Sequence, residues 1–487
     1  MEDPLLPYHR VMRIDEYSRH DAVALAELVA RGEVTSAELQ ELALQAHQQT
    51  HAHINAVVEF NEPDQRPVVE SGALAGVPMM VKDLFHGQPG QVCGNGSRLS
   101  QGWAVSHPSQ IYSRAVRGGL VNVGRTTTSE FGIMGTTETI AQGPTRSPWN
   151  PEHIAGGSSG GAGAVVGAGV VPVALASDGG GSIRIPASAC GTVGLKPSRG
   201  RVPWGLRLRE PLMGWAVQFA ITRSVRDSAL LLDLLGGPTP GDPEAVDHHP
   251  MSYYKSHQSP PARLRIAWTT DPWSGQGKDP VLHDAVVATV DLLEQLGHEV
   301  TAAAPRFDWE PFQQATANVW AATNAHTIDG FAAMLGRPVN RDTLEGPTLA
   351  TVLHGRRVTG EQLLTAMDLE VELTHTMASF FTSFDILVTP TLGAPVPQIG
   401  HYDPHSNATL DETLSAWSRW ESFLPAFNTT GQPAISLPLH QTPTGLPIGI
   451  QLVAATGRED LLLSLAATLE SALPWAGRTP PVFAGHM

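Results

Sequence analysis

Charged residues are scarce in this sequence, and basic ones are scarcer than acidic ones. Together they make up 16% of the 487 residues, and the formal net charge is −16. An acidic surface of this kind argues against a binding face for nucleic acid or for anionic membranes. Hydrophobic residues make up 41%, which excludes a disordered chain and favours a globular one with a substantial core.

Cysteine is almost absent, and so are long apolar runs. Cys93 and Cys190 are the only thiols. A disulfide between them stays open, but so few cysteines in a large chain favour a reducing compartment. The opening MEDPLLPYHR lacks the apolar stretch of a signal peptide. Glycine and proline interrupt the longest apolar run, 161–176, which is shorter than the roughly 20 residues of a membrane-spanning helix. We expect a cytoplasmic protein in which this run forms a buried helix and a buried strand.

Motifs for metals and nucleotides are also missing. Twenty histidines are present, yet none stands in an H-E-x-x-H pattern, and no cysteine pair has metal-binding spacing. Gly161, Gly163 and Gly167 resemble a dinucleotide loop only loosely, because their spacing differs from G-x-G-x-x-G and no clear strand precedes them. We therefore expect neither a metal nor an organic cofactor.

Strand and helix patterns alternate along the chain, which predicts α/β layers. Helices are expected at 21–31, from Thr35 to about Gln49, at 280–296 and at 458–473. Strands are expected at 54–60, 77–81, 120–124, 264–269, 299–303, 385–389, 434–438 and 447–454. The Pro-rich stretch 238–262 is the best linker candidate, but its flanks have the same pattern on both sides. We therefore expect one domain over 1–487, with a helical N-terminal segment at about 1–50 and an excursion at 238–262.

Three consecutive glycines stand before a serine in SDGGGSIRIPAS at 177–188. Because glycine has no Cβ, the backbone N–H groups of Gly179, Gly180 and Gly181 can converge on one point, and such a nest holds an anion. That anion is either a bound phosphate or the oxyanion of an acyl transfer. A phosphate loop would end in G-K-[ST], whereas this nest ends at Ser182. A hydroxyl beside converging donors is the arrangement that acyl transfer needs.

Two further segments carry candidate side chains that are ambiguous alone. The stretch 156–160 (GGSSG) matches the G-x-S-x-G pattern of a nucleophile elbow, but no hydrophobic strand precedes it. Lys82 follows the apolar run VPMMV, where a lone lysine is usually a strand-end residue whose amine reaches water. Taken singly, either segment is better explained by structure than by catalysis.

Taken together, three segments resemble the amidase signature family. They are GVPMMVKDLF with Lys82, GGSSGGAG at 156–163, and SDGGGSIRIPASACGTVGLKPSRG at 177–200. They occur in that family's order, and Ser158 and Ser182 are 24 positions apart, as its two catalytic serines are.

The resemblance extends over about 20–480 and includes FNTTGQPAISLPLHQTPTGLPIGIQLVAATGRED at 427–460. It implies a single large α/β domain whose mixed, mostly central β-sheet is covered by helices on both faces. Within it, 70–230 would be the catalytic core.

The resemblance also implies a Ser-cisSer-Lys triad. Ser182 would be the nucleophile, Ser158 the bridging serine after a cis Gly157–Ser158 peptide bond, and Lys82 the terminal base. The oxyanion hole would consist of the backbone N–H groups of Gly179, Gly180, Gly181 and Ser182. The supporting residues would be Ser159, Ser177, Asp178 and Arg184. Family members more often have threonine where Ser177 stands and a bulkier residue where Gly179 stands.

Lys82 must be neutral to act as a base near pH 7. Its pKa would have to fall by roughly three units from about 10.4, which corresponds to about 4 kcal/mol. Burial supplies shifts of this size, and the apolar lead-in VPMMV is consistent with burial. Asp83 would oppose the shift by stabilising the ammonium. Neighbouring side chains of an extended strand point to opposite faces, so we predict that Asp83 faces away from the amine.

The implied activity is hydrolysis of a small-molecule amide through an acyl-enzyme, which releases a carboxylate and ammonia or an amine. The block TRSPWN at 145–150 is most similar to general bacterial amidases, which include hydrolases of cyclic nylon oligomers (6-aminohexanoate cyclic dimers). Those hydrolases have a substrate-contacting cysteine near the position of Trp320, so a tryptophan there favours a smaller or aromatic-lined pocket. The expected pocket residues are Ile133, Met134, Trp149, Ile183 and Trp320.

Two other functions stay open. The catalytic subunit of a glutamyl-tRNA amidotransferase would need a partner subunit, and the segment after residue 260 does not resemble that branch. The presence of Lys82, Ser158 and Ser182 together disfavours a non-catalytic binding module on an amidase scaffold. We expect no nucleic-acid or membrane partner. The oligomeric state stays open, with a homodimer as one alternative.

Overall fold

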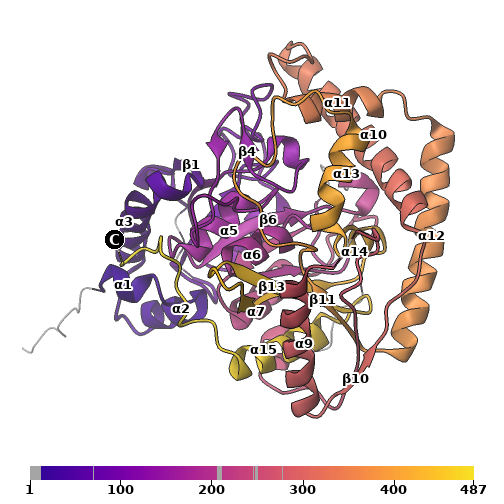
Figure 1. Cartoon of the computed structure of the whole chain (residues 1–487). Helices are drawn as coiled ribbons and strands as arrows, with labels where there is room; N and C mark the ends of the chain where they lie inside the picture. The colour runs from indigo at the N-terminus through magenta and orange to yellow at the C-terminus, as the bar shows by residue number, and fades with distance from the viewer. Residues whose placement is uncertain are drawn as a thin grey trace, which may run out of the picture.

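A large sheet runs through the centre of the structure (Figure 1). The computed structural model describes residues 12–67, 69, 71–205, 211–244, 246, 251–276 and 278–486. The strands of the large sheet are β1 (Val57–Phe60), β2 (Pro78–Lys82), β3 (Val121–Thr126), β6 (Val173–Asp178), β7 (Val193–Lys196), β8 (Val217–Thr222), β9 (Arg265–Trp268), β10 (Glu299–Ala302), β11 (Ile386–Pro390), β12 (Ala434–Gln441) and β13 (Pro447–Ala454). Among the described residues their order is β1-β3-β2-β6-β8-β7-β12-β13-β11-β9-β10. Two short strands, β4 (Glu138–Thr139) and β5 (Gly143–Pro144), pair with each other.

The sheet is mixed, as the family resemblance implies. Strand β2 runs parallel to β3 and β6, while β8 is antiparallel to β6. At the other end, β9 is parallel to β10 and β11, and β12 forms an antiparallel hairpin with β13. Every residue of β2, β6 and β8 is buried. A strand covered on both faces has near-continuous apolar sequence, which explains why VPMMV and VALA show no alternation.

Helices flank this sheet. They are α1 (Ile14–Tyr17), α2 (Ala22–Ala30), α3 (Ser36–Ile54), α4 (Gln110–Arg117), α5 (Gly160–Gly167), α6 (Arg184–Cys190), α7 (Val225–Leu235), α8 (Tyr253–Ser256), α9 (Pro280–Gln295), α10 (Trp309–Leu335), α11 (Gly346–Gly355), α12 (Gly360–Ser383), α13 (Leu410–Glu421), α14 (Pro425–Thr429) and α15 (Glu459–Ala472). Short 3-10 turns cover Pro63–Gln65, Glu130–Gly132 and Pro211–Gly214. Helices α5 and α6 pack against each other and against the middle strands, and α15 packs against β12 and β13.

The elements predicted from periodicity are confirmed. The eight expected strands correspond to β1, β2, β3 and β9 to β13, and the apolar run 161–176 contains most of α5 and the start of β6. The second helix begins with the expected capping box, in which the Thr35 hydroxyl accepts the Glu38 N–H and the Glu38 carboxylate accepts the Thr35 N–H. The chain is therefore a single α/β domain with a mixed central sheet.

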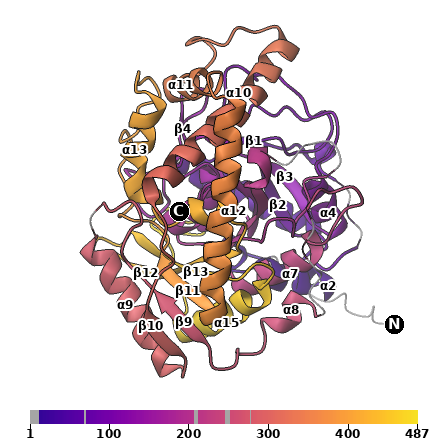
Figure 2. The ribbon, with the colours of Figure 1, turned by 90° about the vertical axis from the view of Figure 1, so that its right-hand side faces the viewer.

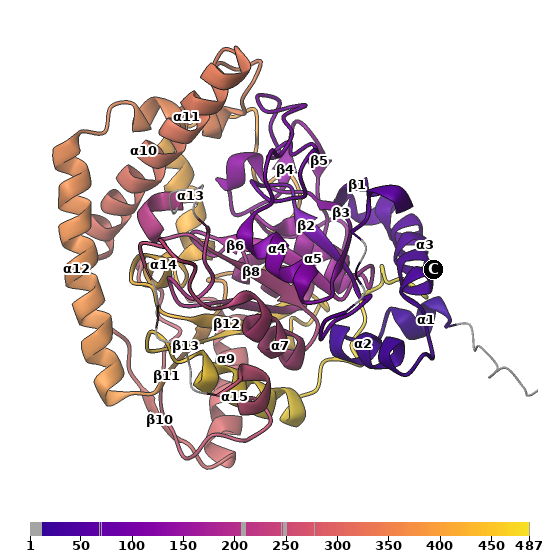
Figure 3. The ribbon, with the colours of Figure 1, turned by 180° about the vertical axis from the view of Figure 1, so that it is seen from behind.

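Helices α10 to α13 form a part of the structure that the sequence patterns did not predict. The long helices α10 and α12 pack together, and α11 packs against α10 (Figures 1 and 2). They lie on the side of the sheet opposite the N-terminal helices α1 to α3, as the view from behind also shows (Figure 3). This placement brings Trp320 of α10 over the loop that follows β6, within 3.4 Å of where a Cβ on Gly179 would be.

The expected excursion at 238–262 is described in part. Residues 245 and 247–250 lie outside the described residues. Helix α8, within this stretch, packs against α7 and α15. None of the described helices combines the length and apolar character needed to cross a membrane. Cys93 and Cys190 are both buried free thiols, so the alternative of a disulfide between them is not realised.

Candidate active site

The predicted triad residues come from three elements that meet at one edge of the sheet. Lys82 is the last residue of β2, Ser158 lies just before α5, and Ser182 lies just before α6. Because β2 and β6 are parallel neighbours, their carboxyl ends lie side by side. The loop that follows β6 is thereby brought next to Lys82. Contact between α5 and α6 brings the two serine segments together in the same way.

Lys82 is completely buried and bonded to hydroxyl groups. Its Nζ is 2.6 Å from the Ser158 Oγ and 3.0 Å from the Ser177 Oγ. Burial lowers the pKa of Lys82 to about 7, although the negative charge of Asp178 opposes the shift. An amine that is largely neutral near pH 7 can accept a proton from the hydroxyl that it contacts.

The carboxylate next to Lys82 in the sequence points elsewhere, as predicted. Asp83 pairs with the buried guanidinium of Arg125 and accepts the Gly94 N–H at 3.0 Å. The Arg125 guanidinium thus compensates the negative charge of Asp83, away from the Lys82 amine. Asp83 is not among the groups that shift the pKa of Lys82, and the only carboxylate that opposes the shift is Asp178.

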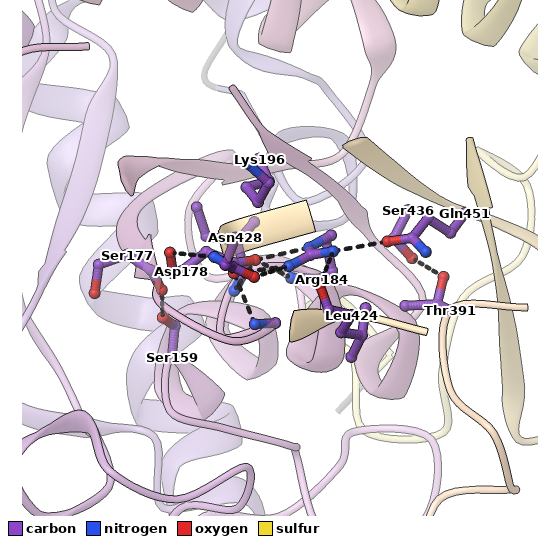
Figure 4. Close-up of polar contacts among 12 residues, drawn as sticks. Ser159, Ser177, Asp178, Arg184, Lys196, Thr391, Leu424, Asn428, Ser436 and Gln451 are labelled. Atoms are coloured by element: carbon purple, nitrogen blue, oxygen red, sulfur yellow. Dashed lines mark hydrogen bonds and ion pairs between the residues drawn. The ribbon is translucent and has the colours of Figure 1, made fainter. Parts of the chain in front are cut away.

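The Ser158 segment has the backbone geometry that the family resemblance implies. The Gly157–Ser158 peptide bond is cis. A Cβ on Gly157 would lie 2.6 Å from backbone atoms of Thr136, so this position has no room for a side chain. The next residue, Ser159, donates its hydroxyl to the Ser177 carbonyl at 3.2 Å and its N–H to the Ser182 carbonyl at 3.3 Å. These bonds tie the Ser158 segment to the loop that carries Ser182 (Figure 4).

A buried ion pair holds the glycine loop. Asp178 and Arg184 are both fully buried, with Arg184 Nε donating to Asp178 Oδ2 at 2.9 Å. Burial raises the pKa of Asp178, but the charge and hydrogen bonds of Arg184 outweigh burial and hold it below its ordinary value. The Arg184 guanidinium also donates to the side-chain oxygens of Asn428 and Gln451 and to the Leu424 carbonyl (Figure 4). The carboxylate therefore stays ionised and organises the loop around itself.

This arrangement corrects one residue of the predicted oxyanion hole. The Gly181 N–H donates to Asp178 Oδ1 at 2.7 Å and so points at the carboxylate, with Gly181 at φ 129°. The N–H groups of Gly179, Gly180 and Ser182 donate to no group among the described residues. Only these three are available to hold an oxyanion. The resemblance assigns all four backbone N–H groups of the loop to the oxyanion hole. In the structure the Asp178 carboxylate accepts one of them, the Gly181 N–H.

Ser158 and Ser182 line a common cavity but do not contact through a hydrogen bond. Within the described part of the chain, no hydrogen bond joins their hydroxyls. Ser177 lines the same space, which we call the base-side cavity. Catalytic hydrogen bonds are often long before substrate binds and tighten in the reactive complex.

A second cavity opens on Ser182, and five aromatic side chains contribute to its wall. We call it the aromatic cavity; it shares Gly179, Ser182 and Trp320 with the base-side cavity. Its aromatic residues are Trp215, Trp309, Phe312, Trp320 and Trp417. Ile133, Met134 and Glu421 also line it. The predicted pocket residues Ile133, Met134 and Trp320 are thus brought together.

Trp149 and Ile183, also expected in the pocket, do not line either cavity. The Trp149 indole N–H donates to the Cys190 carbonyl at 2.8 Å, and its ring lies against Gly191. Ile183 is fully buried because the chain turns into α6 at this point and directs its side chain toward Gly194. Proximity in sequence to Ser182 was a poor guide to exposure. The residues missed, such as Trp215 and Trp417, lie on distant segments with no local signal.

Within the described residues, no group of three or more His, Cys, Asp or Glu side chains could hold a metal ion. The only charged residue among the described residues of the aromatic cavity wall is Glu421.

Comparison with known proteins decides the family. The model of the Amidase family matches residues 35–463. The chain belongs to the amidase family. This amidase is 36% identical over 478 residues to the 6-aminohexanoate-cyclic-dimer hydrolase of Paenarthrobacter ureafaciens, an alignment that covers 94% of this chain and 96% of that protein. It is 31% identical over 476 residues to an acylamidase of Rhodococcus erythropolis, with 94% and 96% covered.

Solved structures agree with this assignment. A 6-aminohexanoate cyclic dimer hydrolase complexed with substrate matches the amidase with a TM-score of 0.89 at 34% identity, covering 96% of this chain and 99% of that one. A bacterial aryl acylamidase of the amidase signature enzymes matches with a TM-score of 0.82 at 26% identity, covering 94% and 99%. The amidase is therefore an amide-hydrolysing enzyme.

Proposed function

We propose that the amidase hydrolyses small-molecule amides with a Ser182–Ser158–Lys82 triad and a covalent acyl-enzyme. The observation that carries this proposal is the fully buried Lys82 amine, 2.6 Å from the Ser158 hydroxyl, beside the cavity that Ser158 and Ser182 share. A serine hydroxyl is a weak nucleophile unless a base takes its proton during attack. A lysine whose pKa is about 7 can be that base without a histidine.

In the first half-reaction, the Ser182 Oγ attacks the carbonyl carbon of the amide. Its proton passes to Ser158, whose own proton passes to Lys82. The carbonyl oxygen becomes an oxyanion and accepts hydrogen bonds from the N–H groups of Ser182, Gly180 and Gly179, which are free of protein partners among the described residues. Lys82 then returns the proton through Ser158 to the leaving nitrogen, the C–N bond breaks, and ammonia or an amine departs.

The second half-reaction repeats the proton path with water. Water attacks the ester carbon of acyl-Ser182 while Lys82 takes its proton through Ser158. The tetrahedral intermediate collapses to release the carboxylic acid, and Ser182 regains its proton. The amide and one water molecule are thus converted into the carboxylic acid and ammonia or an amine, and the enzyme returns to its starting protonation state.

The lining of the aromatic cavity suggests the acyl group. Five aromatic side chains provide an apolar wall beside Ser182, which suits an aliphatic or aromatic chain. The similarity to a cyclic-dimer hydrolase and to acylamidases makes amides of medium-length acids the first candidates.

A fluorophosphonate probe and a panel of aliphatic and aromatic amides test this proposal. The probe should label Ser182 in the native enzyme, because the reagent reacts with an activated serine. Ser182→Ala should lose labelling and lose kcat/KM by roughly 10⁴-fold or more while it keeps the native unfolding temperature. Ser158→Ala, with Ser182 intact, should be labelled far more slowly. Hydrolysis that persists in Ser182→Ala would place the nucleophile elsewhere.

A further inference from the structure

One carboxyl group lines the aromatic cavity and has no hydrogen-bond or ion-pair partner among the described residues. Glu421 is the last residue of α13 and lines the cavity together with Gly179 and Ser182. No described residue donates a hydrogen bond to its side chain, and no cation is paired with it. Burial raises the pKa of Glu421 to about 8, and the negative charge of Asp178 adds to the shift. Glu421 is partly exposed, so a ligand in the cavity that donates a hydrogen bond can reach its carboxyl oxygens.

The neighbouring backbone leaves room for this carboxyl group. A Cβ on Gly135 would lie 2.4 Å from the Glu421 Oε1, so any side chain at 135 would displace the carboxyl head. The two positions also line a smaller adjoining space with Trp417 and Trp420.

The chemistry of the triad decides which half of the substrate meets Glu421. In the proposed function, on which this step rests, Ser158 delivers the proton to the leaving nitrogen. Ser158 and Ser177 line the base-side cavity and not the aromatic one. The leaving amine must therefore lie on the base side, and the acyl chain extends from Ser182 into the aromatic cavity. The far part of that chain reaches the wall that contains Glu421.

We propose that Glu421 determines acyl specificity by accepting a hydrogen bond from an N–H group at the far end of the acyl chain. The substrate class is then amides of carboxylic acids that carry a distal nitrogen donor, either a free ω-amine or a second amide. A carboxyl oxygen accepts from both, and an ammonium group would add the strength of a charge-assisted bond. The aromatic wall would hold the methylene chain between the two polar ends.

The test compares kcat/KM for three series of primary amides of increasing chain length: unsubstituted, ω-amino and ω-acetamido. At each chain length, kcat/KM of the ω-amino or ω-acetamido amide is divided by that of the unsubstituted amide. For the native enzyme this ratio should exceed one at one particular chain length. Glu421→Leu should reduce this preference by roughly 10- to 100-fold, the range expected for a hydrogen bond to a charged or partly charged group. Glu421→Gln should keep preference for the acetamido series, because its carbonyl still accepts, and lose it for the amino series.

Two further variants separate this role from a structural one. Gly135→Ala should reduce the same preference, because its Cβ displaces the carboxyl head while Glu421 itself is retained. Glu361→Leu, on the exposed start of α12, makes the same chemical change away from the cavity and should leave the preference intact. A preference that survives Glu421→Leu, or an equal loss on all three series, would overturn the proposal.

The panel also distinguishes the inference from the function on which it rests. Ser182-dependent hydrolysis of unsubstituted amides, with no gain from a distal nitrogen at any length, would reject the role of Glu421 and retain the triad. A lack of Ser182-dependent hydrolysis in all three series would reject the proposed function itself. Thermal unfolding of each variant, compared with the native enzyme, identifies any loss that is due to misfolding.

Discussion

At the scale of single residues, the site depends on the electrostatics of Lys82. Complete burial removes the water that would stabilise an ammonium, while the partners of its Nζ are two neutral hydroxyls, Ser158 and Ser177. Asp83 is neutralised by Arg125 on the opposite face of the strand. A lysine with these surroundings is biased toward the neutral form that a base requires.

This bias predicts the pH dependence of the reaction. Since the pKa of Lys82 is about 7 and only its neutral form accepts a proton, kcat/KM should rise with pH through about 7 and level off above it. Lys82→Ala should lower kcat/KM by roughly 10²- to 10⁴-fold and abolish this limb. Glu421 also titrates near this range, at about 8, so Glu421→Gln serves as the control and should keep the limb near 7. A rate that stays level down to about pH 5 would contradict a neutral-lysine base.

At the scale of elements, the connection from β6 to α6 is held from within by Asp178. One carboxylate accepts the N–H groups of Gly181 and Ile183 and pairs with Arg184 at the start of α6. This fixes the loop independently of the substrate. The N–H groups of Gly179, Gly180 and Ser182 have no hydrogen-bond partner among the described residues, and all three residues line the cavities.

The ion pair should therefore matter for stability as well as for activity. Asp178→Asn keeps the shape of the side chain but leaves the buried Arg184 charge uncompensated, which should lower the free energy of unfolding by about 3–5 kcal/mol. Asp329→Asn removes a carboxylate from a largely exposed pair with Arg356 and should cost less than about 1 kcal/mol. Urea unfolding followed by far-UV circular dichroism measures both. Equal losses in the two variants would show that the buried pair has no special role.

An element could be predicted from the sequence where the pattern that indicates it lies within one continuous segment. The strands β1 to β3 and β9 to β13 and the capped helix α3 were predictable because their patterns or caps are local. The three segments of the proposed triad could be singled out because they match a family, and the expected cis bond before Ser158 is present. Gly181 was misassigned because its hydrogen bond to Asp178 depends on how the loop folds.

The aromatic cavity could not be predicted in the same way. Its wall comes from α10, α13 and the segment around Trp215, which converge on Ser182 only through tertiary packing. Helix α12 has just three buried residues, Ala366, Leu373 and Met377, so its apolar pattern is weak. Trp320 was placed near the pocket by family resemblance and not by its surroundings in the sequence.

At the scale of the whole molecule, the active site is built from both halves of the chain. Strand β7 pairs with β12, which joins the N-terminal and C-terminal parts into one sheet. Arg184, two residues after Ser182, is bonded to Asn428 and Gln451 from the far end of the sequence. Helix α12, in the foreground of Figure 2, buries Leu373 and Met377 in a cluster with residues of β11 to β13. Its side chains Leu364, Met367 and Val371 are exposed to solvent.

This architecture predicts a gradient of local stability that hydrogen exchange can measure. The amides of β2, β6 and β8 lie in strands buried along their whole length, so they should exchange only when the entire domain unfolds. Helix α12 buries little surface and should open at a lower free energy, with exchange well before that of β6. A fluorophosphonate adduct on Ser182 should then slow exchange in α10, because Trp320 lies over the loop that carries the adduct, and leave α2 unchanged. If α12 exchanged as slowly as β6, α12 would unfold together with the sheet as one cooperative unit. The predicted gradient of local stability would then be absent.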